Sequence, residues 1–165
     1  WDPNFKGSDI KLSNNNLTAS KVGDYDYQFL LGSLEITSGR QYWEIKIDKY
    51  GDEEDLFIGV SRKEIDLNIR PLDSGMFWGY MCLCSKKVGP DGLLIDYGYQ
   101  AKTGDVIGVL LEYKSGLATL SFYRNGAKCG VAFSNLTGSF VPAVCMNYGD
   151  IQVTLDPKAA PPYSQ

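Results

Sequence analysis

Apolar and polar residues alternate with a period of two along several short stretches of this chain. In residues 42–48, YWEIKID, the side chains of Trp43, Ile45 and Ile47 fall on one face of an extended strand, and the charged side chains fall on the other. Residues 106–113, VIGVLLEY, are apolar on both faces, which predicts a strand covered on both sides. The alternation therefore favours β-strands as the main elements.

Ten further stretches are short, closely spaced and bounded by Gly, Asn, Asp or Pro, which is the pattern of an all-β sandwich or barrel. No segment has a convincing 3.6-residue apolar period, and the best candidate for a helix is one turn within residues 61–68, SRKEIDLN. The additional predicted strands are Ile10–Leu12, Leu17–Ala19, Gln28–Leu31, Leu56–Ser61, Met76–Cys84, Gly92–Asp96, Leu117–Arg124, Lys128–Phe133, Val141–Met146 and Gln152–Leu155.

Turn residues connect the strands of the second half of the chain. Asn125 and Gly126 form the pair that a type I′ turn needs, because both central positions of that turn have positive φ. A second short connection lies in YKSGLA, so residues 106–133 are predicted to form a three-stranded meander. Residues 158–165 are rich in Pro and Ala, and we expect this tail to lie on the surface or to be frayed, after a single domain at residues 1–157.

The composition narrows the function classes. A chain of 165 residues is long enough for one domain. Its net charge of −4 argues against a nucleic-acid partner, because proteins that bind nucleic acids normally present a basic surface to the phosphates. The sequence contains no apolar run long enough to suggest a segment that inserts into a membrane. Because the chain starts at Trp1 instead of Met, we expect it to be a piece of a longer protein.

The sequence predicts no enzyme, metal or cofactor. It contains no histidine, which excludes catalytic dyads and triads built on histidine. Cys82 and Cys84 are two residues apart, a spacing that suits two side chains on one face of a strand better than half of a zinc site. Two Asn-Leu-Thr sequons, at Asn16 and Asn135, would matter only in the secretory route, and we expect a cytoplasmic protein.

Five stretches follow one another along the chain: SGRQYWEIKID, FIGVSR, GMFWGY, GDVIGVLLEYKSGLATLSFYRNGAKCGVAF and FVPAVCMNYGDIQVTL. In content and order they resemble the SPRY domain, the core of PRY-SPRY modules. The upstream residues 1–20 resemble the strands that precede this core. The sequence is most similar to the SPRY domains at the C-termini of tripartite-motif ubiquitin ligases, especially the neuronal COS-box branch, and SOCS-box SPRY proteins are next nearest.

This resemblance implies a curved sandwich of two antiparallel sheets, whose loops at one edge bind a peptide or protein partner. It also implies a domain that is not an enzyme and that selects substrates for a ubiquitin ligase. The isolated domain is then expected to be monomeric, within a parent that oligomerises through a coiled coil. In SOCS-box SPRY proteins a Trp-Gly pair contributes to the peptide surface where this chain has Tyr148 and Gly149.

Aromatic residues divide into two groups. Trp43 and Trp78 lie inside strand patterns and are expected in the core. Tyrosines in loops are candidates for partner contacts, because a tyrosine combines a large contact area with few rotatable bonds. The acidic stretch YGDEED favours a basic partner, and the Arg70 guanidinium could pair with an acidic group. The candidate contacts are Tyr25, Tyr27, Tyr50, Asp52, Arg70, Asn147, Tyr148 and Gly149.

We define the loop surface as residues 21–27, 50–55, 64–75 and 147–150. Two alternatives to partner binding stay open. The first is a structural domain that associates with itself or with a neighbouring domain of its own chain. The second is an extracellular carbohydrate-binding sandwich, which the loop aromatics and the sequons suggest and which predicts disulfides and glycans.

Overall fold

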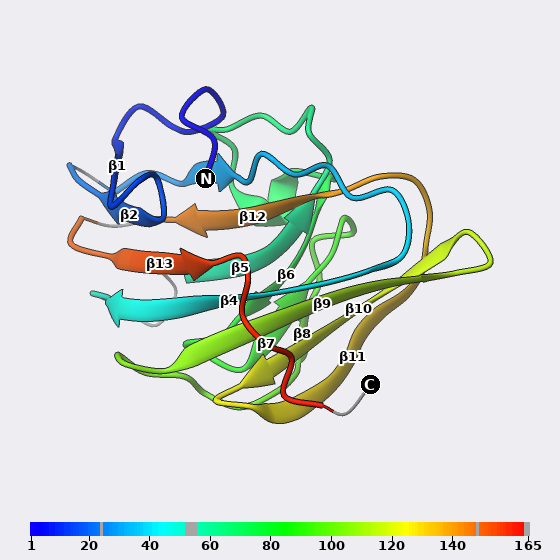
Figure 1. Cartoon of the computed structure of the whole chain (residues 1–165). Helices are drawn as coiled ribbons and strands as arrows, with labels where there is room; N and C mark the ends of the chain where they lie inside the picture. Colours follow the sequence, from blue (N-terminus) through cyan, green and yellow to red (C-terminus); the bar gives the residue numbers. More distant parts are fainter. Residues whose placement is uncertain (24, 52–55, 148, 164–165) are drawn as a thin grey trace.

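The computed structural model describes residues 1–23, 25–51, 56–147 and 149–163 of the chain. Over these residues all strand pairs are antiparallel, and the strands form two sheets that stack face to face (Figure 1). The first sheet has the order β1-β2-β13-β4-β9-β10-β11. Its strands are β1 (Ile10–Ser13), β2 (Thr18–Lys21), β4 (Arg40–Lys49), β9 (Val106–Lys114), β10 (Leu117–Arg124), β11 (Ala127–Leu136) and β13 (Gln152–Asp156).

The second sheet has the order β3-β12-β5-β6-β7-β8. Its strands are β3 (Gln28–Leu31), β5 (Leu56–Ser61), β6 (Phe77–Met81), β7 (Lys86–Val88), β8 (Leu94–Asp96) and β12 (Val141–Met146). The predicted all-β sandwich of two antiparallel sheets is therefore confirmed.

The main core lies between the two sheets. Trp43, Ile45 and Ile47 of β4 are buried there, as their alternation predicts, and Trp78 of β6 is buried among the same residues. Burial of apolar side chains on the facing sides of two sheets is what holds a sandwich together, at about 25 cal/mol for each Å² of apolar surface removed from water. The prediction that both tryptophans belong to the core is confirmed.

A second apolar cluster covers the outer face of the six-stranded sheet. Phe29, Phe57 and Phe77 form its centre, and their rings meet edge to face. Ile65 and Leu72, from the segment between β5 and β6, are among the residues that pack onto this cluster. The segment at residues 62–76 is therefore held against the sheet along its length.

The meander of the second half is as predicted. β9 pairs with β10, and β10 pairs with β11. Asn125 has a φ of 51° and Gly126 a φ of 81°, so both central residues of the turn have the positive φ that a type I′ turn requires. Ser115 and Gly116 repeat this conformation, with φ of 53° and 80°, in the turn between β9 and β10.

The tail after residue 157 lies on the surface, and its described part is packed instead of frayed. Tyr163 stacks on Tyr123, with 6.0 Å between ring centroids, and Arg40 lies 5.4 Å from the centroid of the Tyr163 ring. Tyr42 and Leu110 belong to the same small cluster. The tail thus covers the outer face of β9, in line with the prediction that this strand is covered on both sides.

Two expectations about elements were wrong, and one strand was not predicted. Residues 61–68 form no α-helix, because this segment has an irregular backbone that packs Ile65 and Leu67 onto the apolar cluster of the six-stranded sheet. The short helical element in this region is a 3₁₀ turn at Pro71–Asp73. The strand expected over Met76–Cys84 ends at Met81, and Cys82 and Cys84 lie in the turn that follows. β7 was not anticipated, because a strand of three residues carries too little alternation to recognise.

Candidate functional site

Two segments of the loop surface lie side by side at one end of the sandwich (left in Figure 1). The first joins β2 to β3 and the second joins β12 to β13. Backbone hydrogen bonds connect them at three points: Lys21 N–H to Ile151 O (2.9 Å), Asp150 N–H to Lys21 O (3.0 Å) and Asp26 N–H to Asn147 O (3.1 Å). The strand ends therefore fix both segments to each other.

The contact between the two segments leaves no room for a side chain at residue 149. A Cβ added to Gly149 would lie 2.9 Å from the carbonyl oxygen of Gly23, which is closer than Cβ atoms normally approach an oxygen. Gly23 itself has a φ of 87°, which favours glycine. A pair of glycines thus allows the two backbones to meet, and Val22, Gly149 and Asp150 border a shallow depression beside them.

Beneath the first segment lies a buried lysine. The side chain of Lys21 is fully buried, and its ammonium group donates hydrogen bonds to Asp26 Oδ1 at 2.7 Å and to the carbonyl oxygen of Val22 at 3.3 Å. Asp9 Oδ2 lies 3.9 Å from the same nitrogen. A buried charge is tolerated when it is paired and hydrogen-bonded in this way.

Asp26 connects this lysine to β3. Its second carboxylate oxygen accepts a hydrogen bond of 2.9 Å from the buried amide group of Gln28. The hydrogen bond from Lys21 is the main reason that the pKa of Asp26 lies below its usual range. Lys21, Asp26 and Gln28 were not predicted as a unit from the sequence, although a lysine at an inward position of β2 was a possible signal.

The predicted tyrosines differ in exposure. Tyr25 is 61% exposed, whereas Tyr27 is half-buried and packs edge to face against Phe57, with 6.1 Å between centroids. Tyr50 is half-buried and packs against the main core. Of these three, Tyr25 is the most exposed to solvent.

Arg70 is exposed and already paired. Its Nε and one terminal nitrogen each donate to a carboxylate oxygen of Asp73 at 3.0 Å, in a bidentate pair that closes the 3₁₀ turn. This pair, with a smaller contribution from Tyr27, raises the pKa of Arg70. The segment is joined to β3 through Leu67, whose carbonyl oxygen accepts the amide of Phe29 at 2.8 Å.

The remaining predicted contacts have different positions. Asn147 is buried, and its carbonyl oxygen holds the neighbouring segment, so its backbone contributes more to the shape of the surface than its side chain does. Near the loop surface, Lys49 Nζ lies 3.7 Å from Asp150 Oδ1 in an exposed ion pair. Asp52 and Tyr148 lie outside the described residues.

Within the described ranges, no three Cys, Asp or Glu side chains come together as they would around a metal ion. The four cysteines are free thiols, and burial raises the pKa of Cys82 and Cys145 well above the ordinary thiol value.

In the part of the chain that the structure describes, no helix has the length and apolar character needed to cross a membrane.

Comparison with known proteins agrees with the fold. The chain is 34% identical over 148 residues to the E3 ubiquitin-protein ligase TRIM9 of Drosophila melanogaster, covering 87% of this chain and 19% of that protein. It is 30% identical over 155 residues to Ran-binding protein 10 of Danio rerio, covering 87% of this chain and 24% of that protein. The chain thus spans about a fifth to a quarter of the length of these relatives.

Solved structures share the same architecture. A human SPRY domain superposes with a TM-score of 0.79 at 22% identity, covering 93% of this chain and 98% of that one. The SPRY domain of human HERC1 superposes with a TM-score of 0.77 at 23% identity, covering 96% and 98%. The SPRY domain family itself matches residues 40–158. The chain therefore belongs to the SPRY domain family, whose members are protein-interaction modules.

Proposed function

We propose that the loop surface binds a peptide or protein partner and that this domain selects substrates for a ubiquitin ligase. The observation that carries the first part is the exposed Tyr25 on a fixed base: its segment is hydrogen-bonded to the 147–150 segment and lies over the Lys21–Asp26 pair. An aromatic side chain held on a rigid support loses little entropy when it is buried by a partner.

The second part rests on the similarity to TRIM9, which is named as an E3 ubiquitin-protein ligase. The domain would supply recognition, and a catalytic domain elsewhere in the parent would supply ubiquitin transfer. We place this function in the cytoplasm, a setting in which four free thiols are ordinary. The free thiols also fail to support the extracellular carbohydrate-binding alternative, which predicts disulfides. The other predictions, a monomeric domain and a parent joined by a coiled coil, are part of the same proposal.

Photo-crosslinking tests the binding surface directly. A photoreactive phenylalanine analogue is placed at residue 25 of the full-length protein in cells, and at the control position Leu117, which is exposed in the β9-β10 hairpin. We expect residue 25 to capture a partner that Leu117 does not capture. Tyr25→Ala in the isolated domain should then weaken binding of that purified partner by about tenfold or more, without change in the melting temperature.

Equal affinity of wild type and Tyr25→Ala for the captured partner would reject the loop surface as the binding site. The ligase role is judged separately, by ubiquitylation of the captured partner in cells that express wild-type or Tyr25→Ala protein. A partner that binds through Tyr25 but shows the same ubiquitylation with both proteins would leave the interaction intact and refute substrate recognition.

A further inference from the structure

Among the described residues, β8 is the last strand of the six-stranded sheet and pairs only with β7, so its outer side is an edge of the sheet. The amide of Tyr97 donates to the carbonyl oxygen of Ser85 at 2.9 Å, which marks a hydrogen-bonded pair of this antiparallel ladder. Such pairs recur at every second residue, so the backbone groups of Ile95 point toward β7 and those of Leu94 and Asp96 point outward. β8 therefore presents N–H and C=O groups to which another strand can bind.

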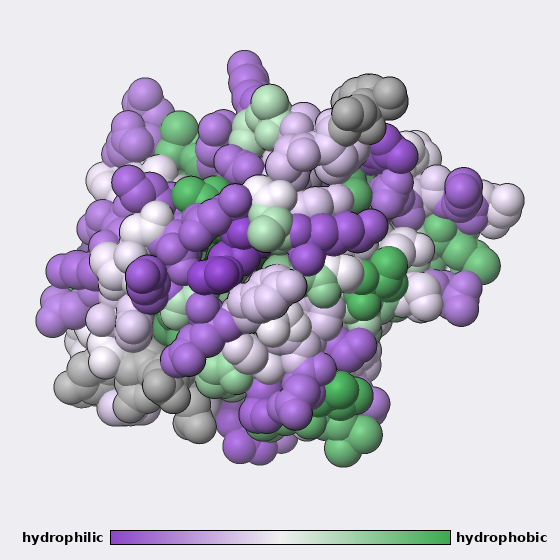
Figure 2. All heavy atoms as spheres, turned by 90° about the horizontal axis from the view of Figure 1, so that it is seen from below, coloured by the Kyte–Doolittle hydropathy of each residue, from purple (hydrophilic) through white to green (hydrophobic). Residues whose placement is uncertain are grey.

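The side chains on this edge are apolar and exposed. Leu93, Leu94 and Ile95 are consecutive and are 61%, 44% and 49% exposed. Exposed sheet edges are normally protected by charged side chains or proline, because an apolar edge attracts other strands. On the molecular face seen from below, hydrophobic groups form separate patches among hydrophilic side chains (Figure 2). Three consecutive exposed apolar residues at a sheet edge thus indicate a site that binds a partner.

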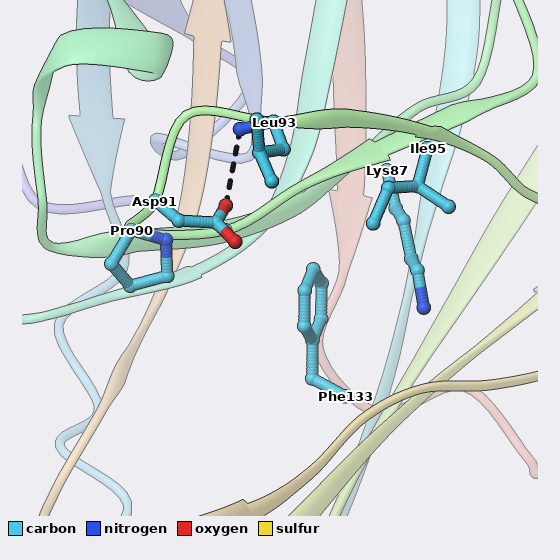
Figure 3. A pocket seen from close by; sticks show the side chains of 7 residues that line it. Lys87, Pro90, Asp91, Leu93, Ile95 and Phe133 are labelled. Atoms are coloured by element: carbon cyan, nitrogen blue, oxygen red, sulfur yellow. Dashed lines mark hydrogen bonds between the residues drawn. The ribbon is translucent and has the colours of Figure 1, made fainter.

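A groove of about 450 Å³ lies beside the edge (Figure 3). Leu93 and Ile95 are two residues apart and share one face of the chain, and both line the groove, as does Phe133 of β11. The groove therefore runs between the edges of the two sheets. Its lining includes Lys87, Pro90, Asp91, Leu93, Ile95 and Phe133.

Contacts between the two sheets fix the walls of this groove. Lys87 Nζ donates to the carbonyl oxygen of Ala132 at 2.7 Å and lies 5.2 Å from the centroid of the Phe133 ring. Gly89 passes so close to Phe133 that an added Cβ would be 3.1 Å from the ring. The groove exists without a partner, which lowers the entropic cost of filling it.

The charged groups around the groove are engaged within the chain. Lys86 forms an ion pair with Asp96 at 2.5 Å, and Asp91 Oδ1 accepts the amide of Leu93 at 3.0 Å. The Lys87 ammonium is occupied by its carbonyl and ring contacts. The groove therefore has an apolar surface, and the charged groups around it already have partners within the chain. Such a surface is complementary to uncharged side chains of a partner.

We propose that β8 binds an extended segment of a partner protein, which pairs with β8 as an additional strand and places an uncharged apolar side chain in the groove. Backbone hydrogen bonds supply affinity in this mode, and the groove supplies specificity for alternate side chains. A second copy of the chain fits less well, since its β8 adds only three residues. This site is independent of the loop surface: β8 and β3 are opposite edges of their sheet, and the loop segment at residues 21–27 leads into β3.

Fluorescence anisotropy with a defined probe tests the proposal. The probe is a short labelled peptide in which leucine alternates with threonine, titrated with the domain. Ile95→Lys places a charge in the groove and should weaken binding by about tenfold or more. The matched control Leu117→Lys changes another exposed apolar residue, 40% exposed against 49% for Ile95, in the β9-β10 hairpin. It should leave binding unchanged, as should Tyr25→Ala on the loop surface.

Two methylated peptides test the pairing itself. In a strand, alternate amides point to opposite edges, so only one of the two sets, leucine or threonine amides, can face β8. Methylating one set should abolish binding and methylating the other should preserve it. Equal effects of the two methylated peptides, absence of binding up to about 1 mM, or equal affinity of wild type and Ile95→Lys would overturn the proposal. A dimer in light scattering that Ile95→Lys dissociates would assign the edge to a second copy and also overturn it.

Discussion

The ammonium group of Lys21 lies 2.7 Å from Asp26 Oδ1, with the lysine side chain fully buried and the aspartate about half exposed. This asymmetry decides what each residue contributes. Removing the aspartate takes a hydrogen-bond acceptor at 2.7 Å from a buried charge, whereas removing the lysine leaves a carboxylate that water can solvate.

We therefore expect Asp26→Ala to lower the free energy of unfolding by about 1–3 kcal/mol and Lys21→Met, which keeps the length of the buried side chain, to lower it by less than about 1 kcal/mol. Urea unfolding of the two variants measures both values. Equal destabilisation would show that the lysine is not buried as described.

The lowered pKa of Asp26 predicts a contribution to stability that depends on pH. A carboxylate whose pKa is lower in the folded protein stabilises it fully above its unfolded pKa, which is about 3.9, and this contribution is lost as the pH falls below that value. The difference in unfolding free energy between wild type and Asp26→Asn should therefore be largest above about pH 5 and shrink toward about pH 2.5. Glu35→Gln, at a surface carboxylate outside the cluster, serves as the control. A difference that stays constant over this range would contradict the assignment.

Gly149→Ala should separate the two loop segments, because the added Cβ has no room beside the Gly23 carbonyl. We expect faster hydrogen exchange at the amides of Asp26 and Asp150, which bridge the segments, with little change in the strands. Gly39→Ala is the control for destabilisation without a clash, since a Cβ there meets open space and its cost comes from the positive φ of 76° alone. Unaltered exchange at both amides would mean that the close approach does not hold the loops together.

Gly126→Val tests the type I′ turn between β10 and β11. The space around residue 126 is open, with the nearest atom 3.7 Å from an added Cβ, so the cost comes from the positive φ alone. A β-branched residue in that conformation should cost about 1–3 kcal/mol, which lowers the melting temperature by about 2–4 °C for each kcal/mol in a domain of this size. Lys128→Val, an exposed β11 position with no such constraint, should melt close to wild type. An unchanged melting temperature for Gly126→Val would show that the turn tolerates negative φ.

Most strands could be predicted, because their evidence is local. The alternation around Trp43 and the Asn125-Gly126 pair specify a strand and a turn within a few residues of sequence. The segment at residues 61–68 was misjudged as a helical turn because its course depends on the apolar face of a sheet formed by distant strands. Burial of Ile65 against that sheet outweighs a weak local preference.

The sequence by itself determined the all-β class, the antiparallel meander and the core positions of Trp43 and Trp78, since these follow from side-chain period and turn chemistry. Only the tertiary structure decided that Lys21 is buried beneath a loop, that Arg70 is already paired with Asp73, and that Leu93, Leu94 and Ile95 lie on a free edge. The reason is physical: burial and pairing depend on which distant strands become neighbours, and the alternation within one strand does not record its place in the sheet.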